Sequence, residues 1–339
     1  MRRRVLPWVL IVLSLPCLAA VGGAAWQVIA TKQETEAHPA PGQMLDVGGH
    51  KLHLVCEGKG APVVVMDAGL GDSWLTWSRT QPEIATRTRA CSYDRAGLGY
   101  SEPGPYPRDS RQIVDELHTL LTVAHIAPPY VLVGHSFGGY NTRLFASTYP
   151  TEVAGLVLVD ASHEEQTRVF PAGMRALMAG GLNAMRWRTR RAMLGLERAR
   201  GLPAFDAPSV PPEVAGQGEA IGYRTDWYRT MVGEFETFAS LSADEVRASR
   251  HQVDFPLVVV TGSAHLAQDL LGAGMSQVDA DSAARAWQYL QRDEATLSTR
   301  SQHVIATKSS HYVNMDQPEL VIAAVDSVLA QIHRMSQNR

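Results

Sequence analysis

The residues best suited to chemistry lie around Ser136, in the sequence GHSFGG at positions 134–139. This G-x-S-x-G pattern follows an apolar stretch at 130–133, typical of a buried strand, and precedes a helix-like stretch at 140–148. A serine on such a sharp strand-to-helix turn presents its hydroxyl at the sheet edge, and the flanking glycines let the backbone pass close to itself. We therefore predict that Ser136 is a nucleophile for acyl transfer. The alternative interpretation is a glycine-rich turn without a catalytic role.

A serine hydroxyl is a weak nucleophile unless a neighbouring base removes its proton. His311 lies between a short strand expected at 303–306 and the last helix of the chain. In this type of site the base follows the nucleophile and the acid along the chain, so we predict that His311 is the base. The alternative for His311 is an ordinary surface-loop histidine.

A third group must accept a hydrogen bond from the base and stabilise its protonated form. Asp160 ends the apolar stretch at 153–159, the strand expected after the nucleophile, and is our predicted acid. The other usual place is the loop after the next strand, at 256–261, which has no carboxylate before Asp269. Asp269 is therefore the alternative acid, and Asp160 could instead bond only local backbone amides.

An oxyanion hole needs two backbone N–H groups, one of them from the residue after the nucleophile. Phe137 occupies that position. The loop DAGLG at 67–71 follows the strand expected at 62–66, and we predict the second donor there, at the amide of Leu70. The alternative is a plain glycine turn.

These residues must be positioned by strands and helices that alternate along the chain. Strands are expected at 44–47, 51–55, 62–66, 89–93, 130–133, 153–159, 256–261 and 303–306, and helices at 111–124, 140–148 and 316–332. Strands that alternate with helices indicate a parallel sheet covered on both faces. The stretch between 160 and 251 has no strand signal, so we predict a helical cap over Ser136, at about 162–252. Asp316, with Glu319 three residues later, predicts a capping box for the last helix.

The N-terminus looks like a targeting segment. Arginines occupy positions 2–4, and residues 5–30 contain no charged side chain. We expect residues 1–31 to be a transmembrane signal anchor that leaves the catalytic domain extracytoplasmic, or else a cleaved signal peptide of a secreted or periplasmic protein. Residues 32–42 are expected to be a linker, and residues 43–339 the folded domain. The formal net charge is −3, so nothing indicates nucleic acid as a partner.

These motifs together resemble the α/β-fold hydrolases, in particular a bacterial group with an N-terminal membrane segment. The matching stretches are 67–74, 93–101, 134–139, 155–160 and 311–320. The resemblance implies an α/β fold with a mostly parallel eight-stranded sheet and a helical cap, and hydrolysis of an ester or related bond through an acyl-enzyme. The family's nucleophile, oxyanion donors and base correspond to Ser136, Phe137, Leu70 and His311.

Two features depart from that family. Many members have His-Gly where this chain has Ala68-Gly69, and many place the acid in the loop that here occupies 262–265. Asp94 and Arg95 are also similar to the family, and we interpret them as structural because their loop follows an earlier strand. The expected partner is a small, apolar ester, with no metal and no cofactor.

Two other functions stay open. Epoxide hydrolases and haloalkane dehalogenases resemble this chain but attack with a carboxylate, which Ser136 argues against. A catalytically inactive, binding form of the fold is the other alternative.

The sheet order of this fold also places the second strand beside the fourth. Cys56 ends the former and Cys91 lies in the latter, so they could form a disulfide in an oxidising compartment. The alternative is two buried free thiols.

Overall fold

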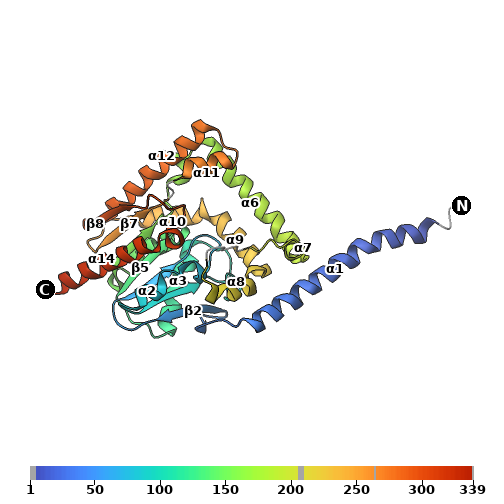
Figure 1. Ribbon diagram of the computed structural model, residues 1–339, viewed down its shortest axis with the longest axis horizontal. Coiled ribbons are helices and arrows are strands. Elements are labelled where there is room, and N and C mark those ends of the chain that lie inside the picture. Colours follow the sequence, from blue (N-terminus) through green and yellow to red (C-terminus); the bar gives the residue numbers. More distant parts are fainter. Residues whose placement is uncertain (1–4, 205–209, 263–264, 338–339) are drawn as a thin grey trace.

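Short runs of apolar, mostly β-branched residues form an eight-stranded sheet at the centre of the protein (Figure 1). The computed structural model describes residues 5–204, 210–262 and 265–337. The strands are β1 (Gln43–Asp46), β2 (Lys51–Glu57), β3 (Val63–Asp67), β4 (Ala90–Asp94), β5 (Tyr130–His135), β6 (Val153–Val159), β7 (Leu257–Thr261) and β8 (Ser301–Ile305).

The order of the strands across the sheet is β1-β2-β4-β3-β5-β6-β7-β8. β1 pairs antiparallel with β2, and β2 pairs antiparallel with β4. Every other neighbouring pair, from β4 to β8, is parallel. Because parallel neighbours need long crossover connections, helices link most of these strands. The predicted α/β fold with a mostly parallel, eight-stranded sheet is thus confirmed.

Helices bury both faces of the sheet, so its central strands are apolar on both sides. In β3, Val63 and Val65 pack with α3 (Ser110–Val123) and α4 (Phe137–Thr148) on one face. The alternate residues Val64 and Met66 face the opposite side, toward α2 (Gln81–Ala85) and α14 (Pro318–Gln337). The remaining helices outside the insertion described next are α1 (Val5–Ala37), α11 (Leu266–Gly272), α12 (Gln277–Glu294), α13 (Val313–Asp316) and the 3₁₀ helices Trp74–Trp77, Pro150–Glu152 and Ala295–Leu297.

Between β6 and β7 the described residues form helices and no strand. These are α5 (Gln166–Val169), α6 (Ala172–Met193), α7 (Leu196–Ala199), the 3₁₀ helix Pro212–Val214, α8 (Ala215–Gly222), α9 (Thr225–Phe238) and α10 (Leu241–Ser249). Figure 1 shows α6 as a long helix that runs from beside α11 and α12 to α7. α10 differs from the others, because its Val246 joins the core under α3 and α4, and its Ser242 Oγ accepts a hydrogen bond from the Ser110 amide at 3.0 Å.

The N-terminal helix α1 projects away from the rest of the protein, and its C-terminal half contacts the insertion (Figure 1). Arg198 of α7 donates to Gln27 at 3.0 Å and to Thr31 at 2.9 Å, and it pairs with Glu34. These contacts support the helix as far as Ala37, so residues 32–37 of the predicted linker are helical instead.

Over the part of the chain that the structure describes, no helix is long and apolar enough to cross a membrane. The transmembrane helix expected within residues 1–31 is therefore not supported by the described residues. The arginines at positions 2–4 lie outside the described residues.

The predicted capping box at Asp316 is wrong. Pro318 begins α14, and Asp316 belongs to the preceding short helix α13. The Asp316 carboxylate instead accepts hydrogen bonds from the Ser310 amide at 2.8 Å and the Ser310 hydroxyl at 2.6 Å. Asp316 therefore holds the loop that carries His311 rather than the start of the last helix.

The pairing of β2 with β4 places Cys56 directly opposite Cys91. The structure contains a disulfide between them, with their Cα atoms 4.1 Å apart. Cys17, the third cysteine, is free and exposed.

Candidate active site

Ser136 lies at the turn between β5 and α4, where the backbone adopts an unusual conformation. Its φ is 51° and its ψ is −118°, a strained geometry for a residue with a Cβ. An added Cβ would lie 2.5 Å from the Gly138 oxygen if placed on Gly134, and 2.2 Å from the Asp67 oxygen if placed on Gly138. The glycines of the motif are thus required by close backbone contacts, and they leave Ser136 partly exposed at the sheet edge.

His311 and Asp160 meet at the same edge. The Nδ1 of His311 lies 2.7 Å from Oδ2 of Asp160, and because a carboxylate only accepts, the ring donates this hydrogen bond. The side chain of His311 is 38% exposed, whereas that of Asp160 is fully buried. The pair therefore has one nitrogen, Nε2, available on the open side.

The structure holds the Asp160 carboxylate from several sides. Its Oδ1 accepts from the Gly262 amide and from the indole Nε1 of Trp287 on α12, each at 2.9 Å. Asp160 also has a positive φ of 41°, so two of the predicted site residues occupy strained backbone. The alternative acid, Asp269, is exposed on α11 and has no contact with His311 among the described residues. Positions 263 and 264 of the intervening loop lie outside the described residues.

The charges around His311 favour its protonated form. Burial lowers the pKa of His311, but the hydrogen bond to Asp160 and the charges of Asp160 and Asp72 raise it more, so it lies above the ordinary value. His135 behaves in the opposite way. Burial and the charge of His311 lower the pKa of His135 to about 3, so that its ring is neutral at neutral pH.

His135, which precedes Ser136 in the chain, also holds the loop that carries His311. Nε2 of His135 donates to the backbone oxygen of His311 at 3.0 Å, and the two rings lie 4.8 Å apart. For the residues described, there is no hydrogen bond between the Ser136 hydroxyl and the His311 ring. Such contacts are often long before substrate binds and shorten in the reacting complex.

The two predicted oxyanion donors lie on adjoining segments. Phe137 begins α4, and the loop that contains Leu70 packs against the elbow, since a Cβ on Gly69 would lie 3.0 Å from Nδ1 of His135. Neither amide has a backbone acceptor within the described ranges. Both N–H groups are therefore able to donate to a substrate oxygen.

Arg95, interpreted from the sequence as structural, contacts the oxyanion loop directly. Its Nη1 donates to the Ala68 oxygen at 2.7 Å and its Nη2 donates to the Gly69 oxygen at 2.6 Å. Its guanidinium also lies 5.5 Å from the centre of the Phe137 ring. Asp94 fits the structural interpretation, because it accepts hydrogen bonds from His53 and the Trp74 amide.

A cavity of about 840 Å³ lies between the oxyanion loop, α13 and the helical insertion between β6 and β7, which is the segment predicted as a cap and is called the cap from here on. Its lining combines apolar side chains from the loop, the cap and α13 with four charged ones: Leu70, Met185, Leu202, Met231, Met315, Asp72, Arg188, Arg191 and Asp316. Tyr312, next to His311, also lines it. Burial raises the pKa of Asp72 to about 6, against the lowering effect of Arg95 and His311. The cavity therefore adjoins the candidate site, and the carboxyl group of Asp72 in its wall can gain or lose a proton near pH 6.

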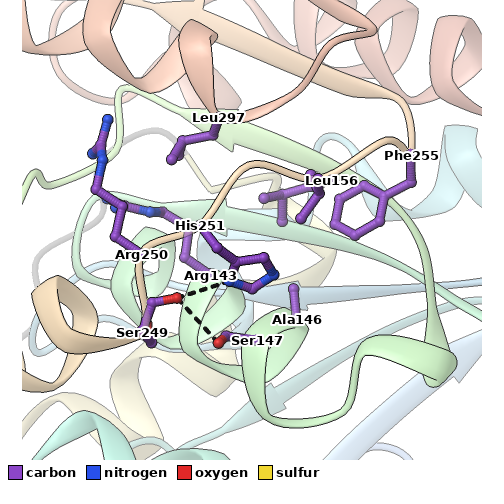
Figure 2. Close-up of a pocket in the computed structure, with 10 residues that line it drawn as sticks. Arg143, Ala146, Ser147, Leu156, Ser249, Arg250, His251, Phe255 and Leu297 are labelled. Carbon is purple, nitrogen blue, oxygen red and sulfur yellow. Dashed lines mark hydrogen bonds between the residues drawn. The ribbon is translucent and has the colours of Figure 1, made fainter.

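A second, much smaller cavity of about 30 Å³ lies elsewhere (Figure 2). Figure 2 shows Ser147 and His251 both hydrogen-bonded to the Ser249 backbone oxygen. None of the predicted site residues lines this cavity, and it holds little more than a water molecule. Across the described ranges, no group of three or more His, Cys, Asp and Glu side chains could hold a metal ion.

The fold and the elbow define a protein of the α/β-hydrolase class. The chain belongs to the Alpha/beta hydrolase family, whose family model matches residues 64–324. An AB hydrolase superfamily protein of Gibberella zeae is 24% identical over 288 residues, which are 79% of this chain and 86% of that protein.

Two solved structures show the same fold. The epoxide hydrolase CorEH is 19% identical with a TM-score of 0.62, and the match covers 85% of this chain and 98% of that one. A thermophilic esterase from Thermogutta terrifontis is 20% identical with a TM-score of 0.58, and the match covers 86% of this chain and 97% of that one. At these identities the similarity is evidence for the fold alone.

Proposed function

We propose that the protein is a serine hydrolase that cleaves a carboxylic ester, or a related acyl bond, through an acyl-enzyme. The observation that carries this proposal is the 2.7 Å hydrogen bond from His311 to the buried Asp160, beside a serine held at φ 51° on a strand-to-helix turn. A nucleophile, a base and an orienting acid at one sheet edge are the groups that acyl transfer requires.

In the proposed reaction, Ser136 Oγ attacks the acyl carbon while Nε2 of His311 takes the hydroxyl proton. Asp160 keeps the His311 ring oriented and stabilises its positive charge. The amides of Leu70 and Phe137 stabilise the oxyanion as it forms. His311 then gives its proton to the alcohol oxygen as the bond from that oxygen to the acyl carbon breaks. In the second half, His311 takes a proton from a water molecule that attacks the acyl carbon, and returns that proton to Ser136 Oγ as the acyl–Oγ bond breaks and the acid leaves.

The proposed substrate is an apolar ester. The cavity of about 840 Å³ has room for a drug-sized molecule, and much of its wall is provided by methionine and leucine side chains. Rates on a series of 4-nitrophenyl esters with acyl chains of increasing length would test this. We expect kcat/KM to rise from short to medium chains, and a steady fall from acetate onward would contradict an apolar acyl pocket.

A fluorophosphonate probe followed by peptide mass spectrometry tests the nucleophile. We expect one adduct, on the peptide with Ser136, in the wild type and none in Ser136→Ala. Ser147→Ala, on the same helix but beside the small cavity, is the matched control and should label normally.

The same probe separates the competing functions. An epoxide hydrolase-like enzyme would use a carboxylate nucleophile and escape labelling, and so would an inactive binding protein. Hydrolysis of an epoxide by unlabelled protein would favour the former. Ser136 at the nucleophile position and the His311–Asp160 pair favour the serine hydrolase.

We further propose that the chain is exported, with the N-terminal segment either retained at a membrane or cleaved. The uncharged stretch at 5–30 and the pairing of Cys56 with Cys91 support this, since such bonds persist in oxidising compartments. Alkylation of cells before lysis, followed by mass spectrometry, tests it. We expect no alkylated thiol at either cysteine, and free thiols in a cytoplasmic fraction would contradict export.

A further inference from the structure

One face of the cap helix α9 lies directly on the oxyanion loop. Trp227, Met231 and Glu234 have the spacing i, i+4 and i+7, which places them in one stripe of the helix. Nε1 of Trp227 donates to the Gly71 oxygen at 2.7 Å, and the Gly71 amide donates to Oε2 of Glu234 at 3.0 Å. Met231 packs so closely that a Cβ on Gly71 would lie 2.7 Å from its Cγ. The cap thus holds both polar backbone groups of Gly71.

Arg95 connects this stripe to the other side of the loop. Its Nε donates to Oε1 of Glu234 at 2.7 Å, and its Nη2 donates to both Oε2 of Glu234 and the Gly69 oxygen. Arg95, Glu234 and Trp227 are all at most 2% exposed. Because these side chains are shielded from water, the charged hydrogen bonds between them are strong and keep the groups in fixed positions.

The Gly69 oxygen and the Leu70 amide belong to the same peptide group. Because that group is planar and trans, its C=O and N–H point in opposite directions. The Gly69 oxygen accepts from Arg95 at 2.6 Å and from the Asp72 amide at 3.0 Å, so its direction is set from two sides. The direction of the Leu70 N–H is then set as well, away from Arg95.

The peptide groups that follow are held by the cap. Gly71 donates to Glu234 through its N–H and accepts from Trp227 through its C=O, so neither group can turn without losing a buried hydrogen bond. Gly71 itself has a φ of +67°, a conformation that few other residues would keep. Leu70 therefore lies between two fixed peptide groups, one held by Arg95 and the other by α9.

We propose that Trp227 and Glu234 of the cap, acting with Arg95, are positioning residues that aim the Leu70 amide at the oxyanion. This inference rests on the proposed function, because it assigns a role toward the transition state of acyl transfer. It also gives the cap a part in the chemical step, beyond shaping the cavity for substrate.

The substitution Trp227→Phe tests the proposal with little disturbance, because it keeps a large aromatic ring and removes the donor to Gly71. Trp77→Phe is the matched control. Trp77 is equally buried, and its indole N–H has no hydrogen-bond partner in the part of the chain that is described. We expect Trp227→Phe to lower kcat about 10- to 100-fold, with little change in KM, because a misplaced oxyanion donor weakens only the transition state. Trp77→Phe should keep kcat within about 3-fold of the wild type, because it removes no hydrogen bond within the described part of the chain.

A trifluoromethyl ketone separates oxyanion positioning from a general loss of structure. It forms a tetrahedral adduct on a serine nucleophile, and the adduct places a negative oxygen in the oxyanion hole. With the ketone carbonyl labelled with ¹³C, the pKa of the adduct's hydroxyl can be followed by NMR. We expect that pKa to be higher, and the ketone to bind more weakly, in Trp227→Phe than in Trp77→Phe. Glu234→Gln should act in the same direction, with circular dichroism as the check on folding.

The outcomes are distinct. Equal adduct pKa values in Trp227→Phe, Trp77→Phe and the wild type, with the adduct on Ser136 in each, would overturn the positioning role and leave the proposed function intact. Failure of the wild type to form any adduct on Ser136 would overturn the proposed function, and this inference with it.

Discussion

His311 donates a 2.7 Å hydrogen bond to Asp160, a residue 151 positions earlier in the chain. Asp160 directly follows β6, the strand beside the nucleophile strand β5, and its carboxylate is fully buried. The other oxygen of that carboxylate is held by the Gly262 amide and the Trp287 indole. The orientation of the His311 ring therefore depends on a group that is itself fixed by β7 and α12.

The first prediction compares the two candidate acids. Asp160→Asn should lower kcat by about 10³-fold or more, because an amide in that place can neither orient the ring correctly nor balance its charge. Asp269→Asn changes an exposed residue of α11, which should alter stability by no more than about 0.5 kcal/mol, and since His311 bonds to Asp160 the change should leave kcat nearly unchanged. Steady-state kinetics on an activated ester measure both, and a larger loss in Asp269→Asn would move the acid to that loop.

The second prediction concerns the nucleophile. Ser136→Ala should reduce hydrolysis of an activated ester by about 10³-fold or more, since only the oxyanion hole and substrate binding would remain to accelerate the reaction. Its circular dichroism and melting temperature should match those of the wild type. A pure sample that kept more than about a tenth of the wild-type rate would exclude Ser136 as the nucleophile.

The third prediction is the pH dependence of kcat/KM. His311 acts as a base only when it is neutral, and its pKa is raised from the ordinary 6.5 by Asp160 and Asp72 against the effect of burial. Activity should therefore be full at high pH and fall as the pH drops through a midpoint above 6.5.

A substitution at Asp72, with Glu83 on the surface as the control, checks the cause of that shift. Asp72→Asn removes one of the negative charges that raise the pKa of His311, so the midpoint should move to lower pH. Glu83→Gln, on the exposed surface of α2, should not move it. If the midpoint did not move in Asp72→Asn, the fall of kcat/KM at low pH would come from the protonation of a group other than His311.

The fourth prediction concerns the disulfide between β2 and β4. Replacing Cys56 and Cys91 together with serine should lower the free energy of unfolding by about 3–4 kcal/mol, from the loop entropy of a 35-residue separation. Denaturant unfolding of the oxidised protein measures the loss. Cys17→Ser changes an exposed free cysteine and is the control. A change below about 1 kcal/mol in the double variant would mean that the bond contributes little to the folded domain.

Local patterns in the sequence were enough to predict a parallel sheet and the turn at Ser136, and to name Asp160 and His311 as candidate partners of that serine. Each depends on residues close together in the chain, such as a glycine pair around Ser136 or an apolar run that ends at Asp160. The position of His311 also followed from chain order, because the base comes after the acid in this type of site.

The groups that hold the site could not be predicted in the same way. Trp287 contacts Asp160 across 127 residues, and Glu234 contacts Gly71 across 163. Both side chains lie in helices whose apolar pattern indicates only a buried face. The predicted capping box at Asp316 was wrong for a similar reason. The last helix begins at Pro318, and the Asp316 carboxylate instead accepts a hydrogen bond from the Ser310 amide.

In the proposed reaction, every turnover passes through an acyl group on Ser136. Rapid quenching of the wild-type protein during hydrolysis of a 4-nitrophenyl ester, followed by peptide mass spectrometry, tests this directly. We expect a burst of 4-nitrophenol close to one equivalent per protein, and an acyl mass on the peptide containing Ser136, which accumulates when deacylation is the slower step. Turnover with the acyl group on a different residue, or with a persistent adduct on a carboxylate, would contradict it.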